Sequence, residues 1–151
     1  MGSLDIALRM LDPNAAPPRY AHEGDAGLDV VSVDDTVIEP GCRAMIHCGF
    51  AIAIPEGFCG LVIPRSGLAA NHGITVLNSP GLIDSGYRGE ICVVLLNTDK
   101  ESSFVIERGM RIAQLVIAQI PQVGLREVSQ LDITSRNEGG FGSSGTQGLE
   151  R

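Results

Sequence analysis

The 151-residue sequence contains no tryptophan and a single lysine, Lys100, and acidic residues outnumber basic ones by 18 to 11. The resulting formal charge of −7 disfavours a non-specific nucleic-acid coat or a membrane-surface protein, because both depend on clustered positive charge. The longest unbroken apolar run, residues 91–96, is too short to cross a bilayer. The first residues also lack the charged and apolar regions of a signal peptide. The composition therefore predicts a cytoplasmic protein with neither nucleic acid nor membrane as a partner.

Paired metal-binding cysteines are missing as well. Cys42, Cys48, Cys59 and Cys92 show no CxxC spacing, and no pair of histidines lies near them in the sequence. A zinc site of the usual kind would need short paired spacings. Because the four cysteines lie within apolar stretches, we predict that they are reduced core residues of a cytosolic protein.

The dominant pattern in the sequence is an alternation of apolar residues with a period of two. Every even position from Cys42 to Ile54 is apolar, and residues 4–10 alternate in the same way. Turns rich in proline and glycine separate most of the strand candidates. Such a series predicts an all-β barrel or sandwich. The further strand candidates are 27–33, 58–63, 74–77, 90–97, 103–106, 111–120 and 125–129.

Helical periodicity is nearly absent, and the chain divides only near its end. One short helix is predicted over residues 66–71, with Ser66 as its N-cap. Residues 1–135 are expected to form one β domain. Residues 136–151 turn rich in glycine and serine, which is typical of a flexible segment. The tail nevertheless contains Arg136 and Phe141, which a simple spacer does not need.

Polar residues in otherwise apolar contexts are the candidates for chemistry. Arg65, Ser66 and Gly67 follow a predicted strand and could bind a phosphate chain, or they could form an ordinary capped turn. Gln114 lies within the apolar stretch 112–116 and is either paired in the core or directed at a ligand.

Two aspartates can each be interpreted in two ways. Asp84 follows an apolar tripeptide and precedes a segment with two glycines and a tyrosine, so it could deprotonate water or simply form a turn. Asp29 lies inside an apolar strand, where its carboxylate must pair with an arginine or orient metal-bound water.

Five segments that contain these residues resemble, in the same order, the five motifs of the trimeric deoxyuridine triphosphatases (dUTPases). The resemblance extends over residues 26–145, which is most of the chain. The five segments are AGLDVVS (26–32), PRSGLA (64–69), NSPGLIDSGYRGE (78–90), GMRIAQLV (109–116) and RNEGGFGSSG (136–145).

The resemblance implies a distorted jelly roll that assembles as a homotrimer with shared active sites. It implies hydrolysis of dUTP to dUMP and pyrophosphate, which keeps uracil out of DNA and supplies dUMP for thymidylate synthesis. Mg²⁺ would be held by the triphosphate and waters rather than directly by protein ligands, with Asp29 ordering the surrounding network. Water activated by Asp84 as general base would attack the α-phosphorus.

The resemblance also assigns the substrate contacts. Tyr87 would stack under the deoxyribose and exclude a 2′-hydroxyl, and Asn78 would recognise uracil together with the hairpin of Leu82 and Ile83. Arg136 and Phe141 would belong to an arm that reaches the phosphates and covers the base. The remaining substrate contacts implied are Cys92 at the base, Arg65, Ser66, Gly67 and Gln114 at the phosphates, and Ser143 and Ser144 in the arm.

Two other functions are compatible with parts of this pattern. A dCTP deaminase of the same superfamily would need a glutamate acting on the base, where this chain has Asp84. A non-catalytic dUTP sensor would need neither Asp84 nor the Phe141 arm. The sequence therefore favours the hydrolase, and an assay for dUMP and pyrophosphate separates the three.

Overall fold

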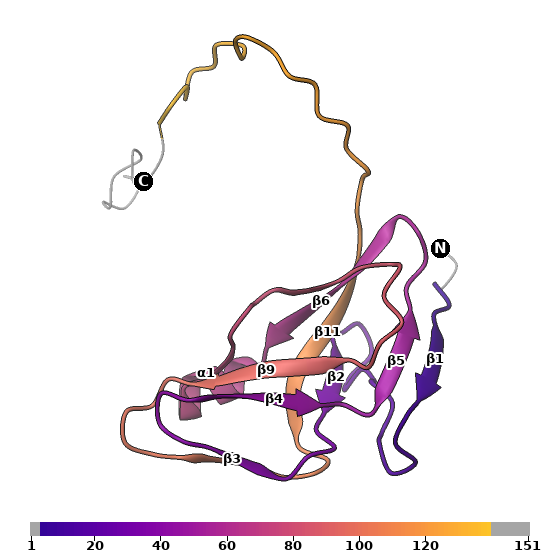
Figure 1. Ribbon diagram of the computed structural model, residues 1–151, viewed down its shortest axis with the longest axis vertical. Helices are drawn as coiled ribbons and strands as arrows, with labels where there is room; N and C mark the ends of the chain where they lie inside the picture. Colours follow the sequence, from indigo (N-terminus) through magenta and orange to yellow (C-terminus); the bar gives the residue numbers. More distant parts are fainter. Residues whose placement is uncertain (1–3, 140–151) are drawn as a thin grey trace.

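The computed structural model describes residues 4–139, which form eleven strands and one short helix. In chain order they are β1 (Ala7–Met10), β2 (Leu28–Val31), β3 (Thr36–Ile38), β4 (Arg43–His47), β5 (Phe50–Ala53), β6 (Phe58–Pro64), α1 (Ser66–His72), β7 (Ile74–Val76), β8 (Gly81–Ile83), β9 (Cys92–Asn97), β10 (Phe104–Ile106) and β11 (Arg111–Gln119). The all-β prediction with one helix is confirmed (Figure 1).

The strands pair antiparallel in four sheets, and none of them closes into a barrel within residues 4–139. The largest sheet has the order β2-β11-β6-β8, and the next has the order β4-β9-β7. Two-stranded pairs, β1-β5 and β10-β3, complete the body. The order of the largest sheet matters for function because it brings β2, β11 and β6 side by side although they are far apart in the sequence.

The core consists mainly of valine, isoleucine and leucine from the inward faces of these strands. β9 shows the principle most clearly, because its residues alternate between buried and half-buried positions along the strand. This is the burial expected of a pleated strand with one face inward, although the β9 sequence itself is almost wholly apolar. Fully buried core residues include Phe50, Ile46, Leu95, Ile112 and Leu115.

The structure corrects the sequence predictions at several turns. The alternating run from Cys42 to Ile54 forms two strands, because Gly49 between them adopts a positive φ of 70°. The three-residue strands β3 and β8 were not predicted. Ser66 is the first helical residue rather than the N-cap, since Arg65 occupies the cap position with an extended backbone. Of the four cysteines, Cys48 and Cys59 are buried as expected, whereas Cys42 is exposed and Cys92 is half-buried.

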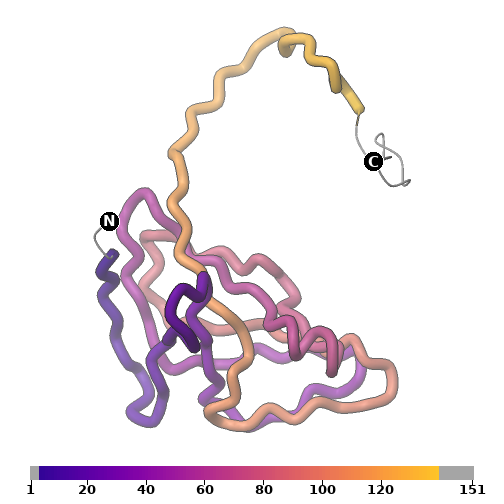
Figure 2. Tube along the Cα trace, turned by 180° about the vertical axis from the view of Figure 1, so that it is seen from behind, coloured from indigo at the N-terminus to yellow at the C-terminus, as the bar shows by residue number. Residues whose placement is uncertain are grey.

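The chain beyond β11 departs from the body as an extended segment (Figure 2). The strand predicted over residues 125–129 is wrong, because residues 120–139 contain no strand. Apolar side chains along this segment are largely uncovered, with Leu125 97% and Ile133 89% exposed. The only helix in residues 4–139, α1, has seven residues, so no helix of this part of the chain is long enough to cross a membrane.

Candidate active site

A buried carboxylate joins three neighbouring strands at one end of the largest sheet. Asp29 on β2 lies opposite Gln114 on β11, and β6, the next strand in the sheet, ends at Pro64 opposite Ala113. Arg65 therefore emerges from β6 close to both residues. Three segments that are distant in the sequence thus bring polar side chains to a single point.

The Asp29 side chain is only 7% exposed and is surrounded by cationic and amide groups. Its Oδ2 accepts a hydrogen bond from Arg111 Nη1 at 3.0 Å, and its Oδ1 lies 3.4 Å from Arg65 Nε. Gln114 Nε2 makes a longer contact of 3.5 Å with Oδ1. A buried carboxylate needs such partners to offset its lost hydration. Both oxygens are therefore committed to protein groups. We call Asp29, Arg65, Arg111 and Gln114 the Asp29 cluster.

Local features keep the Asp29 cluster in place. Arg65 Nη1 also donates to the carbonyl oxygen of Arg111 at 3.2 Å, so its guanidinium is held at two points. Gly27, just before β2, lies against Gln114, and a Cβ there would approach the Gln114 Cβ to 3.1 Å. A larger residue at 27 would push this amide away from Asp29.

Ser66 and Gly67 are exposed beside the Asp29 cluster, at the start of α1. A Cβ at Gly67 would meet nothing within 4 Å. Packing within the described chain therefore does not require glycine at this position. Together with the Arg65 guanidinium and the Gln114 amide, these residues offer hydrogen-bond donors suited to an anion.

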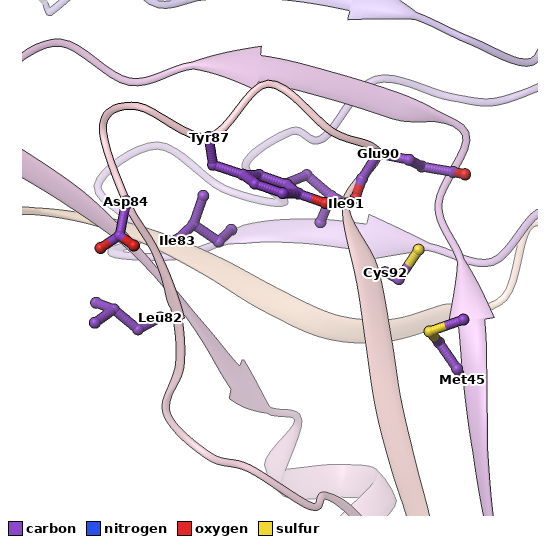
Figure 3. A pocket seen from close by; sticks show the side chains of 8 residues that line it. All are labelled: Met45, Leu82, Ile83, Asp84, Tyr87, Glu90, Ile91 and Cys92. Atoms are coloured by element: carbon purple, nitrogen blue, oxygen red, sulfur yellow. Dashed lines mark hydrogen bonds between the residues drawn. The ribbon is translucent and has the colours of Figure 1, made fainter.

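A separate cavity of about 280 Å³ lies between β8 and β9 (Figure 3). It is lined by Asp84, to which the resemblance assigned catalysis, and by Leu82, Ile83, Tyr87 and Cys92, to which it assigned substrate contacts. Asn78 is exposed near Gly81 and is not among the lining residues. Sequence analysis did not identify Met45, Glu90 or Ile91 as further lining residues.

The Tyr87 ring is held by its own segment. Its hydroxyl donates to the Glu90 carbonyl oxygen at 2.9 Å, and its backbone N–H donates to the Asp84 carbonyl oxygen at 3.1 Å. The ring lies so close over Gly89 that a Cβ there would clash with the Tyr87 hydroxyl oxygen. Gly89 is therefore required for this ring position. At the opposite side of the cavity, burial and the Glu90 carboxylate raise the pKa of the Cys92 thiol.

The cavity and the Asp29 cluster lie at opposite ends of β6. β8 runs antiparallel to β6 with Gly60 opposite Ile83, so Asp84 falls beside Cys59. Arg65 lies six residues further along, and at about 3.3 Å per residue the separation is about 20 Å. We call the cavity and the Asp29 cluster the two half-sites; within one chain, a single phosphate group cannot contact both Asp84 and Arg65.

The carboxyl-terminal candidates are only partly described. Arg136 is exposed, and its Nε donates to the Gly139 carbonyl oxygen at 2.8 Å. This contact lies in the extended segment and joins Arg136 to no group of either half-site. Phe141, Ser143 and Ser144 lie outside the described residues.

Comparison with known proteins identifies relatives of this chain. A dUTPase family model matches residues 14–145. The deoxyuridine 5'-triphosphate nucleotidohydrolase of Thermobifida fusca (strain YX) is 51% identical over 144 residues, covering 95% of this chain and 80% of that protein. The protein of the same name from Clostridium kluyveri is 52% identical over 143 residues, covering 95% of this chain and 99% of that protein.

Solved structures give the same relationship. The Staphylococcus bacteriophage 80alpha dUTPase with dUpNHpp has a TM-score of 0.89 and 32% identity, covering 95% of this chain and 100% of that chain. A mutant dUTPase from phage phi11 of S. aureus, whose structure describes the coordination of a structural Mg(II) ion, has a TM-score of 0.80 and 28% identity, covering 86% of this chain and 100% of that chain. The likeness confirms the predicted jelly-roll type of fold.

The Asp29 cluster generates a stability prediction. Asp29→Asn keeps the side-chain shape but removes the charge that Arg65 and Arg111 share, leaving a buried amide facing two guanidinium groups. We expect the free energy of unfolding in urea to fall by about 1–3 kcal/mol. Asp132→Asn, in an exposed position with no ion pair within residues 4–139, is the matched control and should change it by less than about 0.5 kcal/mol. Equal effects of the two variants would contradict a structural role for the cluster.

Proposed function

The chain belongs to the dUTPase family and is a dUTP nucleotidohydrolase, and from this premise we propose how its residues carry out the reaction. Water activated by Asp84 attacks the α-phosphorus of dUTP and releases dUMP and pyrophosphate. The observation that supports this most directly is the cavity, which presents Asp84 and Tyr87 on one rim. A carboxylate at the edge of a pocket that holds the nucleoside is placed to accept a proton from water beside the α-phosphate.

The cavity suits the nucleoside part of dUTP. Its walls are largely apolar, with Leu82, Ile83 and Ile91 available to contact a pyrimidine ring. The Tyr87 ring, fixed between Gly89 and the Glu90 carbonyl oxygen, gives a flat surface for the deoxyribose. In this proposal Asn78 reads the uracil edge and Cys92 borders the base.

The Asp29 cluster and the adjacent turn suit the triphosphate. Arg65, Ser66, Gly67 and Gln114 supply donors without presenting a free carboxylate, because both Asp29 oxygens are already occupied. An anionic chain is therefore attracted there rather than repelled. Placing the β- and γ-phosphates on these donors leaves the α-phosphate for Asp84.

The residues of the Asp29 cluster also bear on how Mg²⁺ would be held. Protein oxygens that could enclose this ion are not gathered at the Asp29 cluster, whose charge is supplied by arginines. This fits an ion held by the triphosphate and waters, with Asp29 acting through the groups around it. When bound, Mg²⁺ supplies charge neutralisation on the phosphate oxygens.

The separation of about 20 Å along β6 supports a shared active site. A triphosphate has only two P–O–P links, so its α-phosphorus cannot lie beside Asp84 while its terminal phosphates contact Arg65 of the same chain. This separation supports an active site whose two half-sites come from different copies. We propose the closed threefold assembly, in which every half-site meets its complement.

The extended segment supports a third contribution. Val123, Leu125, Leu131 and Ile133 are 77–97% exposed, and such side chains are normally covered in the working assembly. In the proposed homotrimer this segment lies on another copy and delivers Arg136, Phe141, Ser143 and Ser144 to a distant site. All four cysteines are free thiols, which suits the proposed cytoplasmic location.

Asp84→Asn tests the general base. The amide keeps the shape of the carboxylate but cannot accept a proton from water, so kcat should fall below about a tenth of the original value. Binding of dUTP should remain nearly unchanged. Release of pyrophosphate from dUTP, dCTP and dTTP, together with the corresponding monophosphate, gives the rates. A variant with more than a tenth of the original kcat would remove Asp84 from this role, and ammonia release from dCTP would indicate a deaminase.

Tyr87 and Gly89 test the recognition of the sugar. Tyr87→Ala should reduce the preference for dUTP over UTP, because the flat surface that excludes the 2′-hydroxyl is lost. Gly89→Ala should reduce it too, since its new methyl group displaces the ring. Gly86→Ala is the control, because a Cβ there meets nothing within 4 Å. If the ratio of kcat/KM for dUTP and UTP were unchanged in both test variants, residues other than Tyr87 would exclude the 2′-hydroxyl.

Mixed assemblies test the sharing of sites. Asp84→Asn and a chain truncated before Arg136 should each be inactive alone, but should complement one another when unfolded together and refolded. With equal random mixing, a site receives an intact Asp84 chain and an intact arm chain in roughly one case of four, given a closed threefold assembly. Activity no higher than the average of the separate variants, in verified mixed trimers, would show that Asp84 and the arm of one site come from the same chain.

A further inference from the structure

Three potential metal ligands meet across the β4–β9 pair, next to the base cavity. His47 on β4 lies directly opposite Cys92 on β9, and Glu90 precedes Cys92 by two residues. Opposed residues and residues two apart project from the same face of a sheet. One ring nitrogen of His47, a carboxylate oxygen of Glu90 and Cys92 Sγ all lie within 4.8 Å of one another. In Figure 3 the side chains of Glu90 and Cys92 lie together, at the side of the cavity away from Asp84.

The surrounding contacts hold two of these side chains in position. His47 Nδ1 donates to Asp34 Oδ2 at 3.0 Å, and the backbone N–H of His47 donates to the same oxygen at 2.7 Å. Burial opposes ionisation of Asp34, but these hydrogen bonds outweigh it and lower the pKa of its carboxyl group. Glu90 Oε1 accepts a hydrogen bond from the Gly49 N–H at 2.9 Å. A carboxylate that fixes an imidazole in this way is the usual outer partner of a metal-bound histidine.

We propose that His47, Glu90 and Cys92 form a binding site for Zn²⁺, a function separate from the Mg²⁺ that accompanies the nucleotide. Imidazole nitrogen, carboxylate oxygen and thiolate sulfur are the three ligand types that Zn²⁺ takes in proteins. Bonds of about 2.0–2.3 Å bring the ligands of a tetrahedral ion within about 4 Å of one another. A small rotation of the Glu90 or Cys92 side chain therefore completes three-ligand binding with a fourth position open.

The site has a functional consequence because Glu90 and Cys92 also line the cavity that holds Asp84 and Tyr87. An ion bound there places charge and a fixed thiolate at the wall of the base pocket. Zn²⁺ should therefore compete with the nucleotide and raise the KM for dUTP. Mg²⁺ does not substitute for it, since this ion prefers oxygen ligands and retains its waters.

Metal binding without nucleotide is the primary test. Co²⁺, as a spectroscopic replacement for Zn²⁺, is titrated into the full chain, and Zn²⁺ is then titrated against a chromogenic chelator. We expect one ion per chain and a thiolate-to-cobalt charge-transfer band that Cys92→Ser abolishes. His47→Gln and Glu90→Gln should weaken Zn²⁺ binding by more than about 100-fold, and Asp34→Asn by about 10–100-fold. Glu90→Gln retains an acceptor for the Gly49 N–H, so loss of folding does not explain its effect.

Cys42→Ser and His22→Gln are the matched controls, because both residues are exposed and lie outside the cluster. Equal weakening by these controls, or a charge-transfer band that survives in Cys92→Ser, would overturn the proposal. In a second measurement Zn²⁺ should raise the KM for dUTP of the unmodified chain but not that of His47→Gln. If Zn²⁺ raised the KM for dUTP equally in the unmodified chain and in His47→Gln, that result would also contradict the proposal. Because the first measurement contains no nucleotide, its result is independent of the reaction assigned to Asp84.

Discussion

The ion pairs of Asp29 are the interactions on which the proposed phosphate half of the active site depends. A buried carboxylate at the junction of β2, β11 and β6 orients Arg65 and Arg111 and contacts the Gln114 amide. The negative charge inside the sheet permits positive charge to gather at its end, where an isolated pair of arginines would repel. The proposed phosphate-binding function thus rests on a residue that need not touch the nucleotide. The motifs that contain Asp29, Arg65 and Gln114 therefore form one structural unit, although they are far apart in the sequence.

The geometry of β6 sets a second constraint. It places Arg65 past one end of the strand and Asp84 beside the other, so a rigid sheet keeps the two halves of the chemistry about 20 Å apart. Assembly in the proposed trimer converts this separation into a complete site between copies. The extended segment beyond β11 is consistent with such an assembly, because Leu125 and Ile133 are uncovered within residues 4–139 and another chain could cover them. In this proposal, oligomerisation is part of the catalytic arrangement rather than an addition to it.

Sequence patterns anticipated the all-β fold: alternation correctly indicated β1, β4 and β5, and other apolar stretches indicated β6, β9 and β11. Alternation failed at residues 125–129, because it reports which side chains could share a face but not whether a partner strand is present in the same chain. The resemblance to dUTPases identified Asp84 and Tyr87, yet it could not show that Gly89 fixes the Tyr87 ring. The grouping of His47 with Glu90 and Cys92 was not predicted, because the β4–β9 register brings His47 to the other two residues across at least 43 positions of sequence.

In the proposed mechanism, the assembled half-sites direct water to the α-phosphorus of dUTP. Hydrolysis of dUTP in oxygen-18-labelled water, followed by mass spectrometry of both products after a single turnover, tests it most directly. The account predicts one labelled oxygen in dUMP and none in pyrophosphate, because the new P–O bond forms at the α-phosphorus beside Asp84. Label in pyrophosphate would mean that water attacks the β-phosphorus, and it would contradict the placement of the triphosphate across the Asp84 and Arg65 half-sites.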